Sequence, residues 1–211
     1  LGCTPDPVTY GIGEVSPELD RERIALLSGA NSGGKTTLLE TLGSMILLTH
    51  SGLPVPASYA KIGLLDELHI LAKVSGTQSA GALERTLKKL ADVLVSSQRK
   101  IILADELEAI TEPGAASLIL GGLLKASKGN HDTNILLVTH IGNSISDVMG
   151  GKIRIDGIEA QGLDENMDLI VDRNPKRNVL AKSTPELIVR RLASRSKGPT
   201  SEIFSNLLQG F

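Results

Sequence analysis

The sequence predicts an α/β fold with a mainly parallel central sheet flanked by helices, and two observations favour it. Three short apolar runs, none alternating with polar residues, are typical of parallel strands buried on both faces. They are IALL at residues 24–27, IILA at 101–104 and ILLV at 135–138. Segments of helical period separate these runs, and strands that alternate with helices indicate an α/β protein.

Three helices are predicted between and after the first apolar runs. Residues 37–48 are apolar and rich in small residues. Residues 80–94 carry four leucines at spacings of four, three and four, which is an amphipathic helical stripe. Residues 115–124 form another apolar helix candidate. These segments supply the helical layers expected on the two faces of the sheet.

Two further segments are expected to be extended. Residues 8–15, with their glycines, predict an N-terminal antiparallel edge of the sheet. Residues 150–158, GGKIRIDGI, alternate like a strand of a hairpin. The sheet is therefore expected to be mixed at its margin and parallel at its centre.

The C-terminal part is expected to form a small helical appendage. Residues 185–194 predict a helix, with Pro185 in its first turn and Thr184 as its cap. The predicted division is a domain at residues 1–173 and an appendage at 174–211 that serves dimerisation or partner contact. No internal repeat or low-complexity tract interrupts this organisation.

Composition bounds the class of protein. The chain has 211 residues, of which 41% are apolar, 22% charged and only 2% aromatic, with no Trp. This is an ordinary globular composition that lacks the aromatic platform of single-strand nucleic-acid binders. The single cysteine, Cys3, excludes an internal disulfide and fits the reducing cytoplasm. Without a long apolar run or a signal peptide, no membrane association is expected, and a start at Leu1 suggests a domain cut from a longer protein.

Charge is unevenly distributed along the chain. The net charge is −2, but residues 173–197 hold eight Lys or Arg and one acid, Glu186, a local charge of +7. A solvated tail or helix face explains such a cluster. A surface that faces nucleic acid or an acidic partner is the alternative.

A phosphate-binding loop follows the first apolar run. The motif G-x-x-x-x-G-K-[ST] is matched in full by Gly29, Ala30, Asn31, Ser32, Gly33, Gly34, Lys35 and Thr36, and Thr37 continues into the helix. Its backbone N–H groups and the helix N-terminus form a nest for phosphate. Lys35 should reach the β and γ phosphates, and the Thr36 hydroxyl should bind Mg²⁺. A chance glycine-rich turn is the alternative, but it would not require the strand and helix that flank this one.

Two acidic residues end the second apolar run. Asp105 is expected to hold the Mg²⁺ shell, and Glu106 to accept a proton from an attacking water. The alternative is a strand that simply exits into solvent. An Asp-Glu pair rather than a lone Asp favours hydrolysis over nucleotide storage.

A histidine ends the third apolar run. His140 follows Thr139 directly after residues 135–138, so it should lie near the phosphate edge and sense the γ-phosphate. A lone histidine is more often structural. Its place after the phosphate loop and the acidic strand favours a catalytic role.

Together these residues resemble the C-terminal ATPase domain of the MutS family of DNA repair and recombination proteins, within the ABC-type ATPases. The resemblance covers roughly residues 12–192. Residues 29–35 are close to the family's G-P-N-x-G-G-K, and residues 51–57, SGLPVPA, are similar to S-G-x-x-V-P-A. Residues 105–113, DELEAITEP, look like D-E-L-G-x-G-T-D-P of the shorter paralogues that lack a mismatch-reading domain, and residues 139–140 match the family's T-H.

The chain also departs from the family pattern. Ala30 replaces a proline, and Glu108 and Ile110 replace glycines, which predicts a stiffer loop and an altered subunit contact. Ser79 matches the last serine of the family's S-T-F-S, which the resemblance implies is offered to the partner's γ-phosphate across a dimer. An ordinary helix cap is the equal alternative for Ser79. Tyr10 lies where such ATPases place a residue against adenine, although a tyrosine on an edge strand is as plausible.

The function implied is an Mg²⁺-dependent ATPase domain, binding ATP between two copies of itself in a cytoplasmic, MutS-like protein of mismatch repair or recombination. DNA would be bound mostly by parts outside this chain. One alternative is the nucleotide-binding subunit of a membrane transporter, which would require L-S-G-G-Q, whereas residues 77–81 read TQSAG. Another is a structural-maintenance ATPase, although heptad repeats are absent from these residues.

Overall fold

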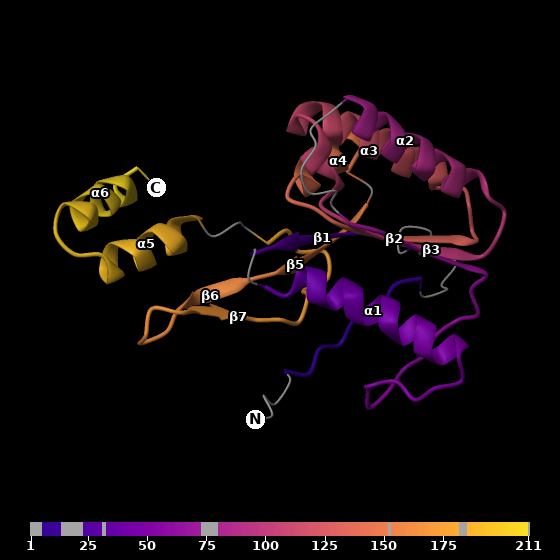
Figure 1. Cartoon of the computed structure of the whole chain (residues 1–211), viewed down its shortest axis with the longest axis horizontal. Coiled ribbons are helices and arrows are strands. Elements are labelled where there is room, and N and C mark those ends of the chain that lie inside the picture. The colour runs from indigo at the N-terminus through magenta and orange to yellow at the C-terminus, as the bar shows by residue number, and fades with distance from the viewer. Residues whose placement is uncertain are drawn as a thin grey trace.

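The computed structural model describes residues 6–13, 23–30, 33–72, 80–151, 153–181 and 185–210. A five-stranded sheet in the order β2-β3-β4-β1-β5 forms its centre (Figure 1). The strands are β1 (Ile24–Gly29), β2 (Glu67–Leu71), β3 (Lys100–Asp105), β4 (Thr133–Val138) and β5 (Arg154–Ile158). Every neighbouring pair in this sheet is parallel. The predicted α/β class and parallel centre are confirmed.

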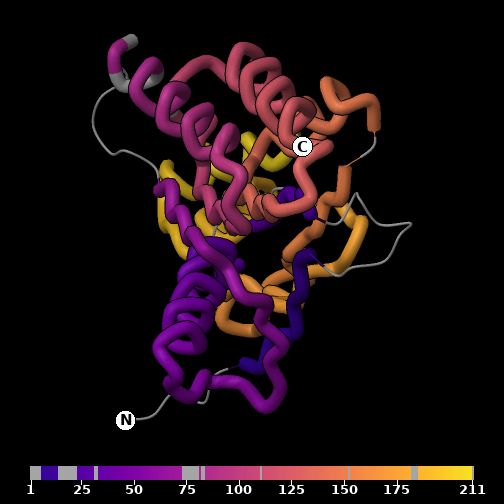
Figure 2. Tube along the Cα trace, turned by 90° about the vertical axis from the view of Figure 1, so that its right-hand side faces the viewer, coloured from indigo at the N-terminus to yellow at the C-terminus, as the bar shows by residue number. Residues whose placement is uncertain are grey.

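Helices cover both faces of the sheet. On one face lies α1 (Lys35–His50), and on the other lie α2 (Ala80–Val95), α3 (Pro113–Ser127) and α4 (Gly142–Val148) (Figure 1). The tube in Figure 2 shows the same two layers from the side, with the sheet between them. The predicted helices at residues 37–48, 80–94 and 115–124 are therefore confirmed, each with slightly longer bounds.

The apolar runs in β1, β3 and β4 are continuous because each of these three strands buries both of its faces. In β1, Ile24 and Leu26 pack into a cluster with α2, α3 and α4, whereas Ala25 and Leu27 pack into a second cluster with α1. Successive side chains of a strand point to opposite faces, so a strand covered on both sides needs an apolar residue at every position. Burial of these side chains, at about 25 cal/mol per Å² of apolar area, is the main stabilising term for the sheet.

The strand register brings three strand ends to one edge of the sheet. In the pairing, Asp105 of β3 lies beside Val138 of β4, and Val138 lies beside Leu27 of β1. Asp105 is the last residue of β3 and Val138 the last of β4, whereas β1 continues past Leu27 to Gly29. The three strands therefore end close to one another. The phosphate loop, the acidic pair and residues 139–140 share this carboxyl edge, where ligands of α/β sheets commonly bind.

Two expectations about the margins of the sheet are wrong. Residues 8–13 form no strand, while residues 14–15 lie outside the described residues. The strand within residues 150–158 is β5, but it pairs in parallel with β1 instead of forming a hairpin. It follows α4, and a helical crossover returns the chain in the parallel direction. The antiparallel pair is β6 (Ala160–Leu163) with β7 (Leu169–Val171), which follows β5.

Several elements have no clear sequence signal. The edge strand β2 reads ELHIL and is mostly half-buried, so it lacks the continuous apolar pattern of β1. The helix α4 spans 7 residues, and the 3₁₀ turn η2 (Leu107–Ile110) spans 4. Elements this short contain too few residues for a period to be recognised.

The C-terminus forms a pair of helices beside the sheet. The helices α5 (Pro185–Arg195) and α6 (Pro199–Leu208) pack on each other, and neither buries a residue in this chain (Figure 1). The predicted helix at 185–194 is confirmed, whereas its proposed cap, Thr184, lies outside the described residues.

The segment before these helices lies on the sheet domain. The Ala181 N–H donates to Ser28 Oγ at 3.2 Å, and Lys176 and Gly157 exchange backbone hydrogen bonds. The Asn174 side chain donates to the Pro7 carbonyl at 3.3 Å. The division at residue 174 stays a prediction, and these contacts favour a later point, between Ala181 and α5.

The basic segment at residues 173–197 pairs many of its charges within the chain. Among the described residues, its ion pairs include Arg173–Asp6, Lys176–Glu159, Arg190–Glu186 and Arg195–Asp168. These exposed pairs contribute little stability, but they neutralise charge that an acidic partner would otherwise meet. They favour the solvated-surface interpretation of this segment. Among the described residues, no helix has the length and apolar character required to cross a membrane.

Adjacent glycines of α3 provide a matched test of the packing between α3 and α4. A Cβ on Gly121 would lie 2.6 Å from Val148 Cγ1 and 2.8 Å from Val148 Cβ, whereas one on Gly122 would meet nothing within 4 Å. We expect Gly121→Ala to lose about 1–2 kcal/mol of unfolding free energy through overpacking. Gly122→Ala should gain about 0.5–1 kcal/mol through helix propensity. Urea unfolding of the two variants checks this, and equal stability would contradict the close approach.

Candidate functional site

The phosphate loop depends on glycines at two places where a side chain cannot fit. Gly29 ends β1 with φ 130°, and a Cβ there would lie 2.2 Å from the Ile158 carbonyl oxygen. A Cβ on Gly33 would lie 2.7 Å from Ile158 Cγ2 and 2.9 Å from the Ala30 carbonyl oxygen. The loop is therefore packed directly against the end of β5. Asn31 and Ser32, at its tip, lie outside the described residues.

The start of α1 presents backbone rather than a capping side chain. Gly34 precedes α1 with φ 84° and, having no side chain, makes no side-chain cap hydrogen bond. No acidic residue occupies the first turn of this helix. The positive end of the helix dipole is thus left for an anion to satisfy.

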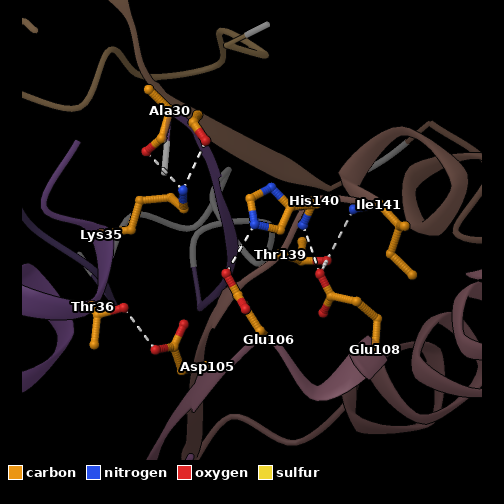
Figure 3. A network of polar contacts seen from close by, with 10 residues as sticks. Ala30, Lys35, Thr36, Asp105, Glu106, Glu108, Thr139, His140 and Ile141 are labelled. Carbon is orange, nitrogen blue, oxygen red and sulfur yellow. Dashed lines mark hydrogen bonds and ion pairs between the residues drawn. The ribbon is translucent and has the colours of Figure 1, made fainter. Parts of the chain in front are cut away.

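Lys35 is buried inside the loop. Its side chain is 4% exposed, and Nζ donates to the Gly29 carbonyl at 2.7 Å and to the Ala30 carbonyl at 2.9 Å (Figure 3). Burial lowers the pKa of Lys35, and the nearby Glu106, Asp105 and Glu108 carboxylates oppose that shift. Lys35 thus closes the loop by binding its carbonyl oxygens.

Thr36 and Asp105 join the phosphate loop to the acidic strand end. Thr36 Oγ1 donates to Asp105 Oδ2 at 2.8 Å (Figure 3). The second oxygen, Asp105 Oδ1, is buried and has no hydrogen-bond partner among the described residues. A buried carboxylate oxygen without a donor is costly, and a cation would satisfy it.

These two side chains fit magnesium better than a metal that needs a full protein cage. In the described part of the chain, no cluster of three His, Cys, Asp or Glu is arranged to hold a metal ion. Mg²⁺ prefers oxygen ligands and commonly binds through one or two protein groups plus phosphates and waters. Asp105 and Thr36 supply that limited set of oxygens.

Glu106 and His140 form a pair at the same edge. Glu106 Oε1 lies 2.9 Å from His140 Nε2, and the two side chains are 29% and 37% exposed, so water can reach both (Figure 3). Glu106 has φ 45°, a left-handed conformation that is unusual for a residue other than glycine. Its N–H donates to the Val138 carbonyl at 3.0 Å, which fixes this turn against the end of β4. Such strain is typical of functional sites.

Glu108 belongs to this network, a role that was not predicted from the sequence. Glu108 Oε1 accepts from Thr139 Oγ1 at 2.9 Å and from the His140 N–H at 2.7 Å (Figure 3). The sequence marked Glu108 only as a departure that would stiffen a loop and alter a subunit contact. An acidic residue close after an acidic strand end was the available signal. The side chain of Ile110, the other departure, is not described.

The remaining predicted residues are not brought into this cluster. Tyr10 lies against Arg154, whose guanidinium is 5.4 Å from the ring centre, and burial and the nearby Asp156 raise the pKa of Tyr10. Its described contacts are thus with β5 and with the apolar cluster between the sheet and α1. Thr37 is exposed on α1, and Ser79 lies outside the described residues. Tyr10 and Ser79 stay predictions.

Comparison with known proteins identifies relatives along nearly the whole chain. This chain is 44% identical over 212 residues to the DNA-binding protein MutS2 of Pyrococcus furiosus. The alignment covers 98% of this chain and 37% of the relative. The Endonuclease MutS2 of Fusobacterium nucleatum is 30% identical over 93% of this chain and 24% of its own length. These two matches, which cover most of the chain, support its membership of the MutS family.

The remaining comparisons set the scope of that similarity. The Endonuclease MutS2 of Gemmatimonas aurantiaca is 31% identical over 65% of this chain and 18% of its own length. The chain thus spans between about a fifth and two fifths of these curated MutS2 relatives. No protein-family model matches it.

The packing of the phosphate loop on β5 can be tested at Gly29. Gly29→Ala forces a Cβ toward the Ile158 carbonyl and imposes a φ that alanine disfavours. We expect a loss of about 2–4 kcal/mol of unfolding free energy by chemical denaturation. Gly63→Ala is the control, because a Cβ there meets nothing within 4 Å. If Gly29→Ala were as stable as the control, the loop would not be packed as described.

Proposed function

We propose that this chain is a Mg²⁺-dependent ATPase domain of a MutS-like protein. The observation that carries the proposal is the 2.8 Å hydrogen bond from Thr36 to Asp105, which joins a complete phosphate-loop motif to an acidic strand end. Either feature alone is common. Their contact at the carboxyl edge of a parallel sheet is the arrangement that phosphoryl transfer requires.

The loop and Lys35 would bind the triphosphate. The helix N-terminus and the loop N–H groups attract phosphate oxygens, and the Lys35 ammonium adds a full positive charge. Lys35 is already held beside Gly29 and Ala30, so little side-chain entropy remains to be lost on binding. A phosphate dianion nearby would favour the charged form that burial disfavours.

Mg²⁺ would be held by a carboxylate oxygen of Asp105 and by the hydroxyl of Thr36. When bound, the ion neutralises phosphate charge in the transition state. The buried Oδ1 of Asp105 would then gain the partner it lacks among the described residues.

Glu106 would act as the general base. Its carboxylate accepts a proton from a water as that water attacks the γ-phosphorus, and ADP leaves as phosphate forms. His140, 2.9 Å from Glu106, would hold this carboxylate in place and contact the γ-phosphate. Partial exposure of both side chains leaves a route for the water.

The whole protein would bind DNA, as the name of the Pyrococcus furiosus relative states for that protein. DNA contact would lie mostly in regions outside this chain, since the basic segment pairs several of its own charges. Two copies would dimerise around ATP, with Ser79 reaching the partner's phosphate. The exposed Leu192, Ile203 and Leu207 of α5 and α6 offer further apolar surface for a partner.

Lys35→Met tests the phosphate loop. The substitution keeps the length of the side chain but removes its charge and its two bonds to loop carbonyls. We expect ATP affinity to fall by at least about 100-fold, because a charge-assisted contact with phosphate is lost. Isothermal calorimetry measures the affinity, and circular dichroism controls for folding. An affinity near that of the parent would refute the assignment of the loop.

Glu106→Gln separates binding from hydrolysis. Glutamine keeps the shape of the side chain but cannot accept the proton, so turnover should fall by about 100-fold or more while Mg-ATP still binds. Phosphate release and calorimetry measure the two properties. Hydrolysis at the parent rate would exclude Glu106 as the base.

Ser79→Ala tests assembly. If Ser79 completes the partner's site, activity per subunit should rise with protein concentration in the parent, and Mg-ATP should strengthen the dimer of the Glu106→Gln variant. Adding Ser79→Ala should weaken that dimer without changing monomer affinity for ATP. Analytical ultracentrifugation measures the dimer. A monomer with concentration-independent turnover would make Ser79 only a helix cap.

A further inference from the structure

We propose that Glu108 is a positioning residue whose carboxylate anchors the end of β4 and so keeps the His140 ring on Glu106. The inference rests on the proposed function, because the Glu106–His140 pair matters only if it serves hydrolysis. It adds a residue that the family pattern does not provide, since the MutS-like motif has a glycine at this position.

One oxygen of Glu108 holds two successive residues. Glu108 Oε1 accepts the Thr139 hydroxyl at 2.9 Å and the His140 N–H at 2.7 Å (Figure 3). Thr139 Oγ1 in turn accepts the Ile141 N–H at 3.2 Å. The backbone on both sides of the His140 side chain is therefore tied down. From that fixed backbone the ring reaches Glu106 at 2.9 Å.

The chain after β3 is shaped so that Glu108 points inward. Glu106 turns with φ 45°, and η2 follows immediately. Leu107, at the start of η2, is 5% exposed and packs into the core between the sheet, α2 and α3. The turn at Glu106 and the buried side chain of Leu107 come immediately before Glu108, and together they leave Glu108 directed at the end of β4.

Burial of the carboxylate makes this contact more than a surface hydrogen bond. Glu108 Oε2 is buried and has no hydrogen-bond partner among the described residues. Desolvating a carboxylate is unfavourable, so the two donors at Oε1 must hold the side chain in place.

Three variants separate positioning from stability. Glu108→Ala removes both accepted bonds, Glu108→Gln keeps an oxygen that accepts them, and Thr139→Val removes one donor. Glu112→Ala is the matched control, because Glu112 is an exposed glutamate in the same segment whose side chain makes no cap hydrogen bond. Each variant is assayed for kcat and KM toward Mg-ATP, and unfolding is measured in parallel.

We expect Glu108→Ala to lower kcat by about 10- to 100-fold with KM unchanged, because misplacing a catalytic pair affects turnover more than binding. Thr139→Val should give a smaller loss of kcat, and Glu108→Gln should restore kcat to within about threefold of the parent. Glu112→Ala should match the parent. The positioning role would be overturned if Glu108→Ala had the kcat of the parent. It would also be overturned if Glu108→Ala and Glu108→Gln lowered kcat by the same factor.

A second measurement tests whether Glu108 positions His140 even if the protein does not hydrolyse ATP. The ring nitrogen resonances of His140, observed by NMR, report its bond to Glu106. In Glu108→Ala they should move to the positions seen in Glu106→Ala, while in Glu108→Gln and Glu112→Ala they should stay at the parent positions. A parent chain without ATPase activity would refute the proposed function alone. Unmoved resonances in Glu108→Ala would refute the anchor whether or not ATP is hydrolysed.

Discussion

The hydrogen bond between Thr36 and Asp105 is the contact on which the candidate site depends. It joins the first turn of α1 to the end of β3, two segments 69 residues apart in the chain. The contact forms because β4 lies between β1 and β3 and because the paired registers align all three strand ends. The parallel sheet thus places the phosphate loop, the acidic pair and the histidine at one edge.

Several energetically unfavourable features lie at this edge. Lys35 is desolvated, Asp105 Oδ1 and Glu108 Oε2 are buried without hydrogen-bond partners among the described residues, and Glu106 has a left-handed backbone. Each feature lowers stability, and each is tolerated because the apolar clusters on the two faces of the sheet are extensive. Local conflict of this kind is typical of binding and catalytic sites, where a ligand supplies the missing partners.

The sequence predicted the parts of the fold that have strong local patterns. The doubly buried strands β1, β3 and β4 are continuous apolar runs, and α2 has a clear leucine stripe, so both kinds of element were recognised. Pairing partners carry no such local signal, which is why β5 was expected in a hairpin although it pairs in parallel with β1. The site was predicted through motif spacing. Glu108 was missed because its role depends on the turn at Glu106 and the anchor at Leu107, which only the folded chain reveals.

The most direct test of the Thr36–Asp105 site is the effect of Mg²⁺ on ATP affinity in the parent and in Asp105→Asn, measured by calorimetry. Asparagine keeps the shape of the side chain and an oxygen for Thr36, but it removes the charge that would hold the ion. Mg²⁺ should strengthen ATP binding by about tenfold or more in the parent and by less than about twofold in the variant. A parent that binds no ATP, or an equal effect of Mg²⁺ on both proteins, would contradict the proposed site.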